Sequence, residues 1–124
     1  MKKSYLSEKA PRPIGPYSQV VQAGQLLFLA GQIPLTAEGK LLEGDVTSQA
    51  RQVMENLKSV LEAAGAAMSH VVRTTIFLAD LGDFETVNKV YSEYFQEPYP
   101  ARSTIQAGKL PRGASVEIDA IAVI

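Results

Sequence analysis

The chain has 124 residues, of which 46% are hydrophobic, and its 12 basic and 13 acidic side chains give a net charge of −1. This length is typical of one domain, and the apolar content suffices for a core. Nucleic acids and anionic membranes favour partners with a clear basic excess, so we expect the chain to bind neither.

Cysteine is absent, and His70 is the only histidine. These counts exclude disulfides, thiolate metal sites, a cysteine nucleophile and any multi-histidine metal site. His70 just precedes an apolar run, and we interpret it as a surface residue rather than a catalyst. The chain has no apolar run of about 20 residues, and its start, MKKSYLSEKAPRP, lacks the apolar core of a signal peptide. We therefore expect a cytoplasmic protein.

The first 16 residues contain three prolines and a glycine, which predict an irregular lead-in. Residues 17–24 and 25–34 are apolar runs that meet at Ala23-Gly24-Gln25, a pattern that predicts a β-hairpin ending at Pro34. Residues 35–45 contain two more glycines and are typical of a loop.

A helix is predicted to begin after Asp45, a residue type that caps helices, and to end before Gly65. Its apolar residues recur three and four apart, at Val46, Ala50, Val53, Met54, Leu57, Val60, Leu61 and Ala64. A second helix is predicted to open at Asp83 and to be stopped by Pro98 and Pro100. Its apolar stripe is Phe84, Val87, Val90, Tyr91, Tyr94 and Phe95. Strands are predicted over residues 71–80, 101–107 and 115–124.

The resulting order, β-β-α-β-α-β-β, predicts an α+β fold in which two helices cover one face of a mixed sheet. The strands are apolar on both faces, however. Residues 71–80 carry Val72, Ile76 and Leu78 on one side and Val71 and Phe77 on the other. We therefore expect a second copy of the chain to cover the face without helices. The alternative is that these are scattered surface hydrophobic residues.

The stretch Tyr99–Gln106, YPARSTIQ, places an arginine at the start of a predicted strand. Alternation puts Arg102 on one face with Thr104 and Gln106, and the small residues on the other. We therefore expect Arg102 to point away from the helices, toward a subunit interface. A guanidinium there can hold a carboxylate through two parallel hydrogen bonds. The alternative is an ion pair with Glu117 or Asp119 of a neighbouring strand.

Glu117 and Asp119 lie on the more polar side of the last strand. A carboxylate among apolar neighbours should have a raised pKa, which a nearby arginine would lower again. Glu117 could then act as a general base toward water. The alternative is an ordinary solvated alternation.

Three further residues are candidates for a binding site. Tyr17 follows Gly-Pro, so a stiff backbone aims its ring, either to pack or to offer its hydroxyl. Gly31, near the end of a strand, would let a ligand approach the backbone, unless it marks a bulge. Asn88 lies off the apolar stripe of the second helix and could equally be a solvated amide. Phosphate-binding loops and metal-spaced clusters are absent.

Taken in order, the segments APRPIGPYSQ, AGQIP, QARQVMENLKSVLEAAG, VVRTTIFLADLGDFETVNKVYSEYF, PARST and LPRGASVEIDAIAV closely resemble the reactive intermediate deaminase (Rid, or YjgF-type) family. The resemblance runs from about Ser7 to Val123. It implies one Rid domain over residues 1–124 with a chorismate-mutase-like α+β fold. It also implies a homotrimer with a central barrel and active sites in clefts between subunits.

The resemblance implies hydrolysis of enamines and imines, such as 2-aminoacrylate and 2-iminobutanoate, to 2-keto acids and ammonia, without cofactor or metal. The family pattern makes Arg102 the carboxylate clamp and Glu117 the group that polarises the attacking water. Tyr17 would line the pocket, the backbone around Gly31 would contact the substrate, and Asn88 would help to shape the site.

Two positions depart from the family pattern. Thr104 replaces a frequent cysteine, and Ala30 replaces a frequent serine. Both positions are assigned to substrate binding. Thr104 excludes a required thiol and any thiol-based regulatory chemistry, whereas the hydroxyl missing at Ala30 would alter substrate preference rather than abolish hydrolysis. The alternative function is a non-catalytic module that binds a small carboxylic acid such as a 2-keto acid. Such a binder needs the cation of Arg102 but has less need of Glu117.

Overall fold

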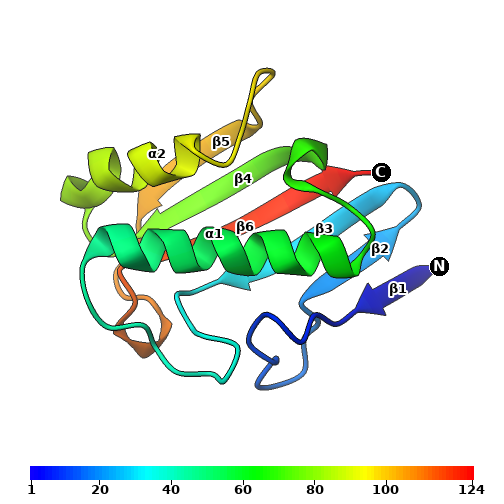
Figure 1. Ribbon diagram of the computed structural model, residues 1–124, viewed down its shortest axis with the longest axis horizontal. Helices are drawn as coiled ribbons and strands as arrows, with labels where there is room; N and C mark the ends of the chain where they lie inside the picture. The colour runs from blue at the N-terminus through cyan, green and yellow to red at the C-terminus, as the bar shows by residue number, and fades with distance from the viewer.

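The computed structural model describes all residues, 1–124, and contains six strands and two helices (Figure 1). In chain order these are β1 (Lys2–Tyr5), β2 (Val20–Ala23), β3 (Leu26–Gln32), α1 (Val46–Ala63), β4 (Val71–Leu78), α2 (Phe84–Ser92), β5 (Ala101–Gln106) and β6 (Val116–Val123). Short 3-10 turns occupy Met68–His70, Leu81–Asp83 and Pro111–Gly113.

The strands form one mixed sheet in the order β1-β2-β3-β6-β4-β5. Only β4 and β5 run parallel, and every other neighbouring pair is antiparallel. The predicted α+β class with a mixed sheet is therefore confirmed. The prediction that residues 1–16 are irregular was wrong for Lys2–Tyr5, which pair with Val20–Ala23 as an edge strand. This strand is short and polar, and an exposed edge requires no apolar alternation.

The predicted hairpin is confirmed. Ala23 pairs with Leu26, so Gly24 and Gln25 form a two-residue turn in which Gly24 has a φ of 62°. A side chain rarely tolerates that backbone conformation, which explains the glycine.

Helix α1 is capped as predicted, because the Asp45 carboxylate accepts a hydrogen bond from the Ser48 N–H at 2.8 Å. Helix α2 differs from its prediction at both ends. Asp83 makes no side-chain capping bond, and Asp80 instead caps the preceding 3-10 turn by accepting from the Gly82 N–H at 2.8 Å. The helix ends at Ser92, well before Pro98. The N–H groups of the next two residues each donate to the carbonyl three positions back, which forms a turn instead of a further helical turn.

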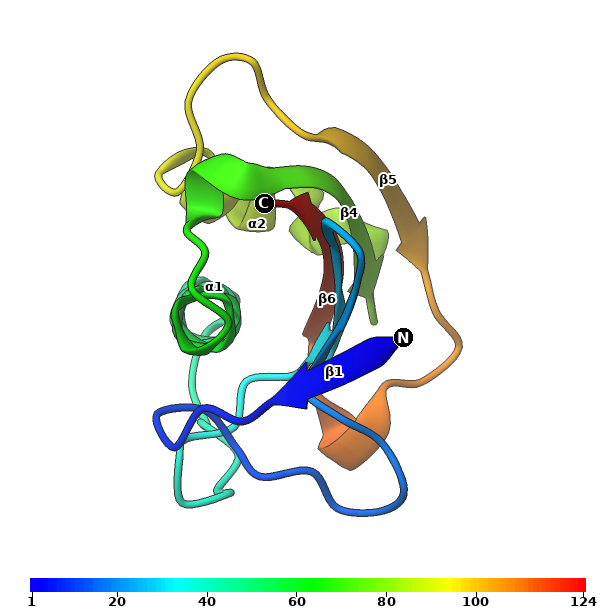
Figure 2. The same cartoon turned by 90° about the vertical axis from the view of Figure 1, so that its right-hand side faces the viewer.

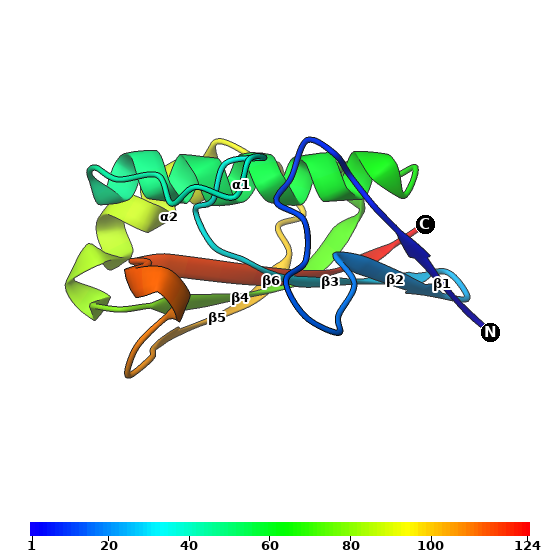
Figure 3. The ribbon, with the colours of Figure 1, turned by 90° about the horizontal axis from the view of Figure 1, so that it is seen from below.

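Both helices lie on the same side of the sheet, as Figures 2 and 3 show. The core fills the space between these layers. The predicted stripe of α1 is confirmed, since Val53, Leu57 and Leu61 are each at most 1% exposed. Strand β6 contributes Val116, Ile118, Ala120 and Ala122 to the same core.

The other face of the sheet, here called the open face, has no helix over it. Exposed apolar side chains on this face come from β3 and β5, with Phe28 43% and Ile105 48% exposed. The prediction of a sheet that is apolar on both faces is thereby confirmed. One detail was wrong: Val71, rather than Val72, joins Ile76 in the core, because the β4–β6 register shifts between Val71 and Arg73.

Two buried amides of α1 tie the connection between β3 and α1 to the body of the fold. Asn56 donates to the carbonyls of Ile33 and Leu35, and Gln49 donates to the carbonyl of Leu42. These bonds hold the chain that follows β3 in a fixed path. Neither helix has the length and apolarity that crossing a membrane would require.

Candidate active site

Arg102 lies in a cleft of about 440 Å³, here called the arginine cleft, between α2 and the start of β5. Its guanidinium Nη1 donates to Asn88 Oδ1 at 2.6 Å. The guanidinium carbon also lies 4.9 Å from the ring centre of Tyr91 and 5.5 Å from that of Phe84. A cation over an aromatic face is attracted by the ring quadrupole, so α2 supports the charge without a carboxylate partner.

The prediction that Arg102 points away from the helices was therefore wrong. In the parallel register Arg102 lies beside Thr74, and both face α2, whereas Ala101 and Ser103 take the open face. The expectation that the small residues of this strand face the helices is wrong, because β5 is an edge strand. The rings and amide of α2 accommodate the long side chain. The alternative of an ion pair with Glu117 or Asp119 is also wrong, because the one ion pair joins Arg51 to Glu93.

Glu117 borders a second cleft of about 440 Å³, here called the glutamate cleft. The residues that line it are Pro11, Arg12, Ile14, Tyr17, Gln19, Gly31, Gln32, Ile33, Leu35, Pro111, Arg112 and Glu117. The structure thus brings together three of the residues predicted for the site, Tyr17, Gly31 and Glu117.

Gly31 lies in a β-bulge and also close to the side chain of Glu117. Leu29 pairs with Ala120 and Gln32 with Ile118, so Ala30 and Gly31 together oppose Asp119. A Cβ added at Gly31 would collide with the Glu117 carboxylate oxygen, and would lie 3.0 Å from its carboxyl carbon. The missing side chain is what leaves room for this carboxylate.

The environment of Glu117 raises the pKa of its carboxyl above the ordinary value. The main cause is partial burial, which disfavours the charged form, and repulsion from Asp119 adds to it. Both carboxylates lie on the open face of β6, between its buried residues. A carboxylate of raised pKa accepts a proton more readily than an ordinary one, which suits a general base.

Gln19 holds one wall of the glutamate cleft in place. This side chain is 1% exposed, and its Oε1 accepts from the Ser7 N–H at 2.6 Å. Its Nε2 donates to the carbonyls of Ser7 and Pro11. Three hydrogen bonds thus fix the segment that leads into the cleft and toward Tyr17, whose side chain is 54% exposed.

The two clefts lie on opposite faces of the sheet within one chain. Arg102 and Asn88 meet on the helix side, whereas Glu117 lies on the open face with Gly31. Thr104 shares the face of Arg102, and Ala30 belongs to the bulge beside Gly31. His70 is exposed, and its Nδ1 accepts a hydrogen bond from the Ala67 N–H.

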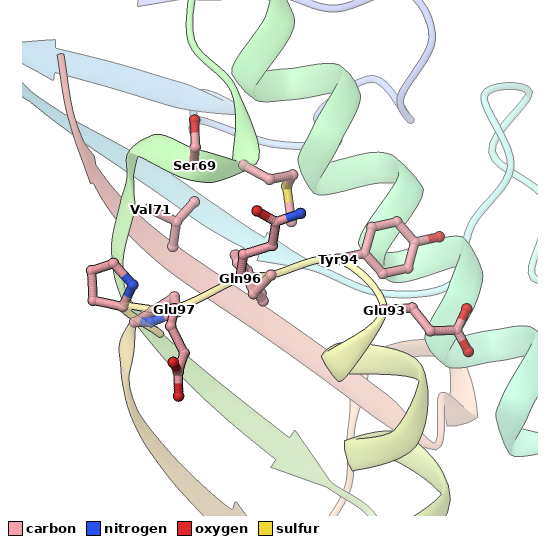
Figure 4. Close-up of a pocket in the computed structure, with 10 residues that line it drawn as sticks. Ser69, Val71, Glu93, Tyr94, Gln96 and Glu97 are labelled. Atoms are coloured by element: carbon pink, nitrogen blue, oxygen red, sulfur yellow. The ribbon is translucent and has the colours of Figure 1, made fainter.

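A third cleft, of about 430 Å³, contains none of the residues predicted for the site. Figure 4 shows it between Ser69 and Val71, at the start of β4, and the segment after α2 that carries Tyr94, Gln96 and Glu97. Glu93 on its rim is paired with Arg51 at 2.7 Å. No group of three or more potential metal ligands occurs in the chain.

Sequence reasoning missed the aromatic partners of Arg102. The apolar pattern placed both Phe84 and Tyr91 on the buried stripe of the second helix, and Tyr99, which lines the arginine cleft, was given no role. The available signal was their spacing, because Phe84, Asn88 and Tyr91 recur four and three apart and so share one face of a helix.

The chain matches the family described as Endoribonuclease L-PSP over residues 7–124. A solved structure of YyfA from Yersinia pestis, a protein of the conserved Rid protein family, superimposes with a TM-score of 0.97 at 40% identity and covers 100% of both chains. The chain belongs to the Rid family. Its fold is the chorismate-mutase-like fold that the resemblance implied.

Relatives of this Rid protein carry several names. Protein DfrA of Myxococcus xanthus is 59% identical over 98% of this chain and 95% of its own length. The 2-iminobutanoate/2-iminopropanoate deaminase of Mus musculus is 47% identical over 99% of this chain and 92% of its own length. A solved structure of Escherichia coli TdcF with bound serine has a TM-score of 0.92 and 41% identity, covering 98% of both chains.

Proposed function

We propose that this Rid protein hydrolyses small 2-imino acids and their enamine tautomers to 2-keto acids and ammonia. Its substrates would include 2-aminoacrylate, 2-iminopropanoate and 2-iminobutanoate. The observation that carries the proposal is the presence of two complementary groups in clefts, Arg102 with free donors and Glu117 with a raised pKa. Relatives named 2-iminobutanoate/2-iminopropanoate deaminase support this choice of substrate.

Each group has a defined task in this reaction. Arg102 binds the substrate carboxylate through donors that Asn88 leaves free. Glu117 accepts a proton from water while the water oxygen bonds to the imine carbon, forming a carbinolamine. The proton then passes from Glu117 to the nitrogen, the C–N bond breaks and ammonia leaves, while the Glu117 carboxylate takes the hydroxyl proton as the keto C=O forms. A protonated imine is already electrophilic, so orientation and proton transfer suffice without metal or cofactor.

We further propose that the working site forms between copies of the chain, in a homotrimer. Arg102 and Glu117 of one protomer open on opposite faces of its sheet, so they cannot act on the same small molecule. A neighbouring copy packed on the apolar open face would bring one protomer's arginine cleft to the other's glutamate cleft. Light scattering should then report about three times the 13.4 kDa chain mass.

Coupled turnover tests the activity. A dehydratase generates 2-aminoacrylate or 2-iminobutanoate, and keto-acid formation is followed with and without the protein. With the imine kept well below KM, we expect acceleration by the wild-type chain and its loss in Arg102→Ala and in Glu117→Gln.

Mixed trimers test the shared site. When Arg102→Ala and Glu117→Gln chains are unfolded together and refolded, some interfaces regain an intact arginine and an intact glutamate. We expect partial activity from this mixture. A chain carrying both substitutions, refolded with an excess of either single variant, serves as the control and should give none. Two inactive variants that stay inactive when mixed would place both groups in one protomer.

A second candidate function is binding of a small carboxylic acid without catalysis. The solved TdcF structure with bound serine favours it, since that relative holds a small molecule with a carboxylate. Calorimetry with pyruvate and 2-oxobutyrate separates the two functions. Binding with unchanged imine decay, in wild type and in Glu117→Gln alike, would identify a binder.

The family description names an endoribonuclease, but a net charge of −1 does not favour binding to a phosphate backbone, so we do not propose that activity.

A further inference from the structure

Helix α2 surrounds the guanidinium of Arg102 with three residues from one of its faces. Phe84, Asn88 and Tyr91 are four and three positions apart, so their side chains line up along the helix. Asn88 fixes one nitrogen of the guanidinium, and the two rings lie within 5.5 Å of its carbon.

Tyr91 is itself held in place by Thr74 of β4. Its hydroxyl is 2.7 Å from the Thr74 hydroxyl, in a buried hydrogen bond in which either oxygen can be the donor. Thr74 is 0% exposed and Tyr91 5% exposed, and the Tyr91 ring also packs on Phe95 with 4.7 Å between ring centres. The ring therefore has little freedom to tilt.

Apolar packing does not account for this polar pair. Thr74 lies on the core face of β4, where its neighbours along the strand, Ile76 and Leu78, are aliphatic. Valine has almost the shape of threonine and would fill the same space without a hydroxyl to satisfy. A buried hydroxyl with a single side-chain partner fixes that partner's orientation, which is what a supporting ring requires.

We propose that Thr74 and Tyr91 are positioning residues, which hold Arg102 in one orientation toward the substrate carboxylate. The inference rests on the proposed function of Arg102 as the carboxylate clamp. An arginine side chain loses much conformational freedom when it is fixed, and an arginine already fixed loses less on binding. The Thr74–Tyr91 bond therefore contributes to affinity without touching the substrate.

Two substitutions remove the bond with almost no change in volume, Thr74→Val and Tyr91→Phe. Each should raise KM for 2-iminobutanoate by about 3- to 10-fold, the equivalent of one neutral hydrogen bond, and leave kcat within about twofold. Carboxylate binding is the same in the ground state and the transition state, so the loss should appear in KM. The double variant should be no worse than either single variant, because one bond is broken in all three.

Two matched variants separate positioning from general damage. Thr74→Ser keeps the hydroxyl and should keep a KM near that of wild type. Tyr94→Phe removes another phenol bond, at 2.6 Å to Glu55, which does not involve Arg102, and should leave KM unchanged. Equal rises in KM for Tyr94→Phe and Tyr91→Phe would overturn the proposal.

A second readout needs no substrate. The NMR order parameter of the Arg102 Nε–Hε bond should fall in Thr74→Val and Tyr91→Phe but stay at the wild-type value in Tyr94→Phe. Unchanged order in the first two variants would overturn the positioning role, whatever the activity. A wild-type chain with an ordered Arg102 that neither hydrolyses imines nor binds keto acids would instead refute the proposed function and leave the positioning role intact.

Discussion

The two faces of the sheet hold their candidate functional groups by different means. On the helix side, side chains hold the cation: Asn88 accepts from Arg102 at 2.6 Å, and two aromatic rings lie beside it. On the open face, the backbone makes room for the anion, because the bulge at Ala30 and Gly31 leaves space for Glu117. The cation is thus oriented by packing, whereas the carboxylate is kept partly desolvated and free to exchange a proton.

The largest expected effect concerns the open face. Glu117→Gln keeps the shape of the side chain but cannot accept a proton, so kcat should fall by about 10²- to 10⁴-fold, the usual contribution of a general base. Initial rates of keto-acid formation at saturating imine give kcat. Asp119→Asn, two residues along the same face, is the control and should stay active at neutral pH. Comparable losses in both variants would mean that negative charge on this face, rather than a particular base, is required.

On the helix side, Arg102→Ala should act mainly on binding. Losing a charged hydrogen-bonded pair costs about 1.5–3 kcal/mol, which raises the KM for the imine and the Kd for pyruvate by about 10- to 100-fold. Calorimetric titration with pyruvate measures the second quantity. Arg102→Lys retains the charge but not the forked donors, and should recover only part of the affinity. Undiminished pyruvate binding by the alanine variant would remove this residue from the site.

Gly31→Ala tests the backbone's part on the open face. The new Cβ would force the Glu117 carboxylate to turn away, which a flexible side chain can do at little cost to the fold. We therefore expect kcat to fall by about 10-fold, as a displaced catalytic group does. Thermal unfolding should show a nearly unchanged midpoint. A large loss of stability would show instead that the collision is relieved by the strands rather than by the carboxylate.

The smallest effect should be a shift in pH dependence. Glu117 must be ionised to accept a proton, so activity rises with pH through its pKa, which partial burial and then Asp119 raise above the ordinary 4.5. Asp119→Asn removes the second cause and should move the acidic limb of kcat to lower pH. The limb is measured with imine generated in situ between about pH 4.5 and 8. A limb that moves upward or stays fixed would argue that Glu117 does not set it.

Much of the fold was predictable from local patterns. The spacing of apolar residues gave α1 and its cap at Asp45, and alternation gave the buried residues of β6. Strand β1 could not be predicted, because Lys2 and its neighbours are held by pairing with β2 rather than by burial. The end of α2 at Ser92 was missed, since proline marks only the last position at which a helix could stop.

For the candidate site, the sequence pattern indicated three residues that lie together, but not the geometry of the two clefts. Tyr17, Gly31 and Glu117 share a cleft as expected. The face of Arg102 was misjudged, because alternation shows which residues share a face but not which face an edge strand turns toward a helix. The parallel pairing of Thr74 with Arg102 decides that point, and it is a tertiary contact without a local signal.

The buried amide of Gln19 has a consequence for how such a protein can change. Hydrogen bonds from this one nearly buried side chain hold the segment from Ser7 to Pro11, which leads to the cleft of Glu117. Gln19 is 1% exposed, so replacing it with leucine would release that segment while the exposed side chains that line the cleft stayed the same. The range of compounds proposed to bind there would therefore depend on a nearly buried amide as well as on the exposed side chains of the cleft.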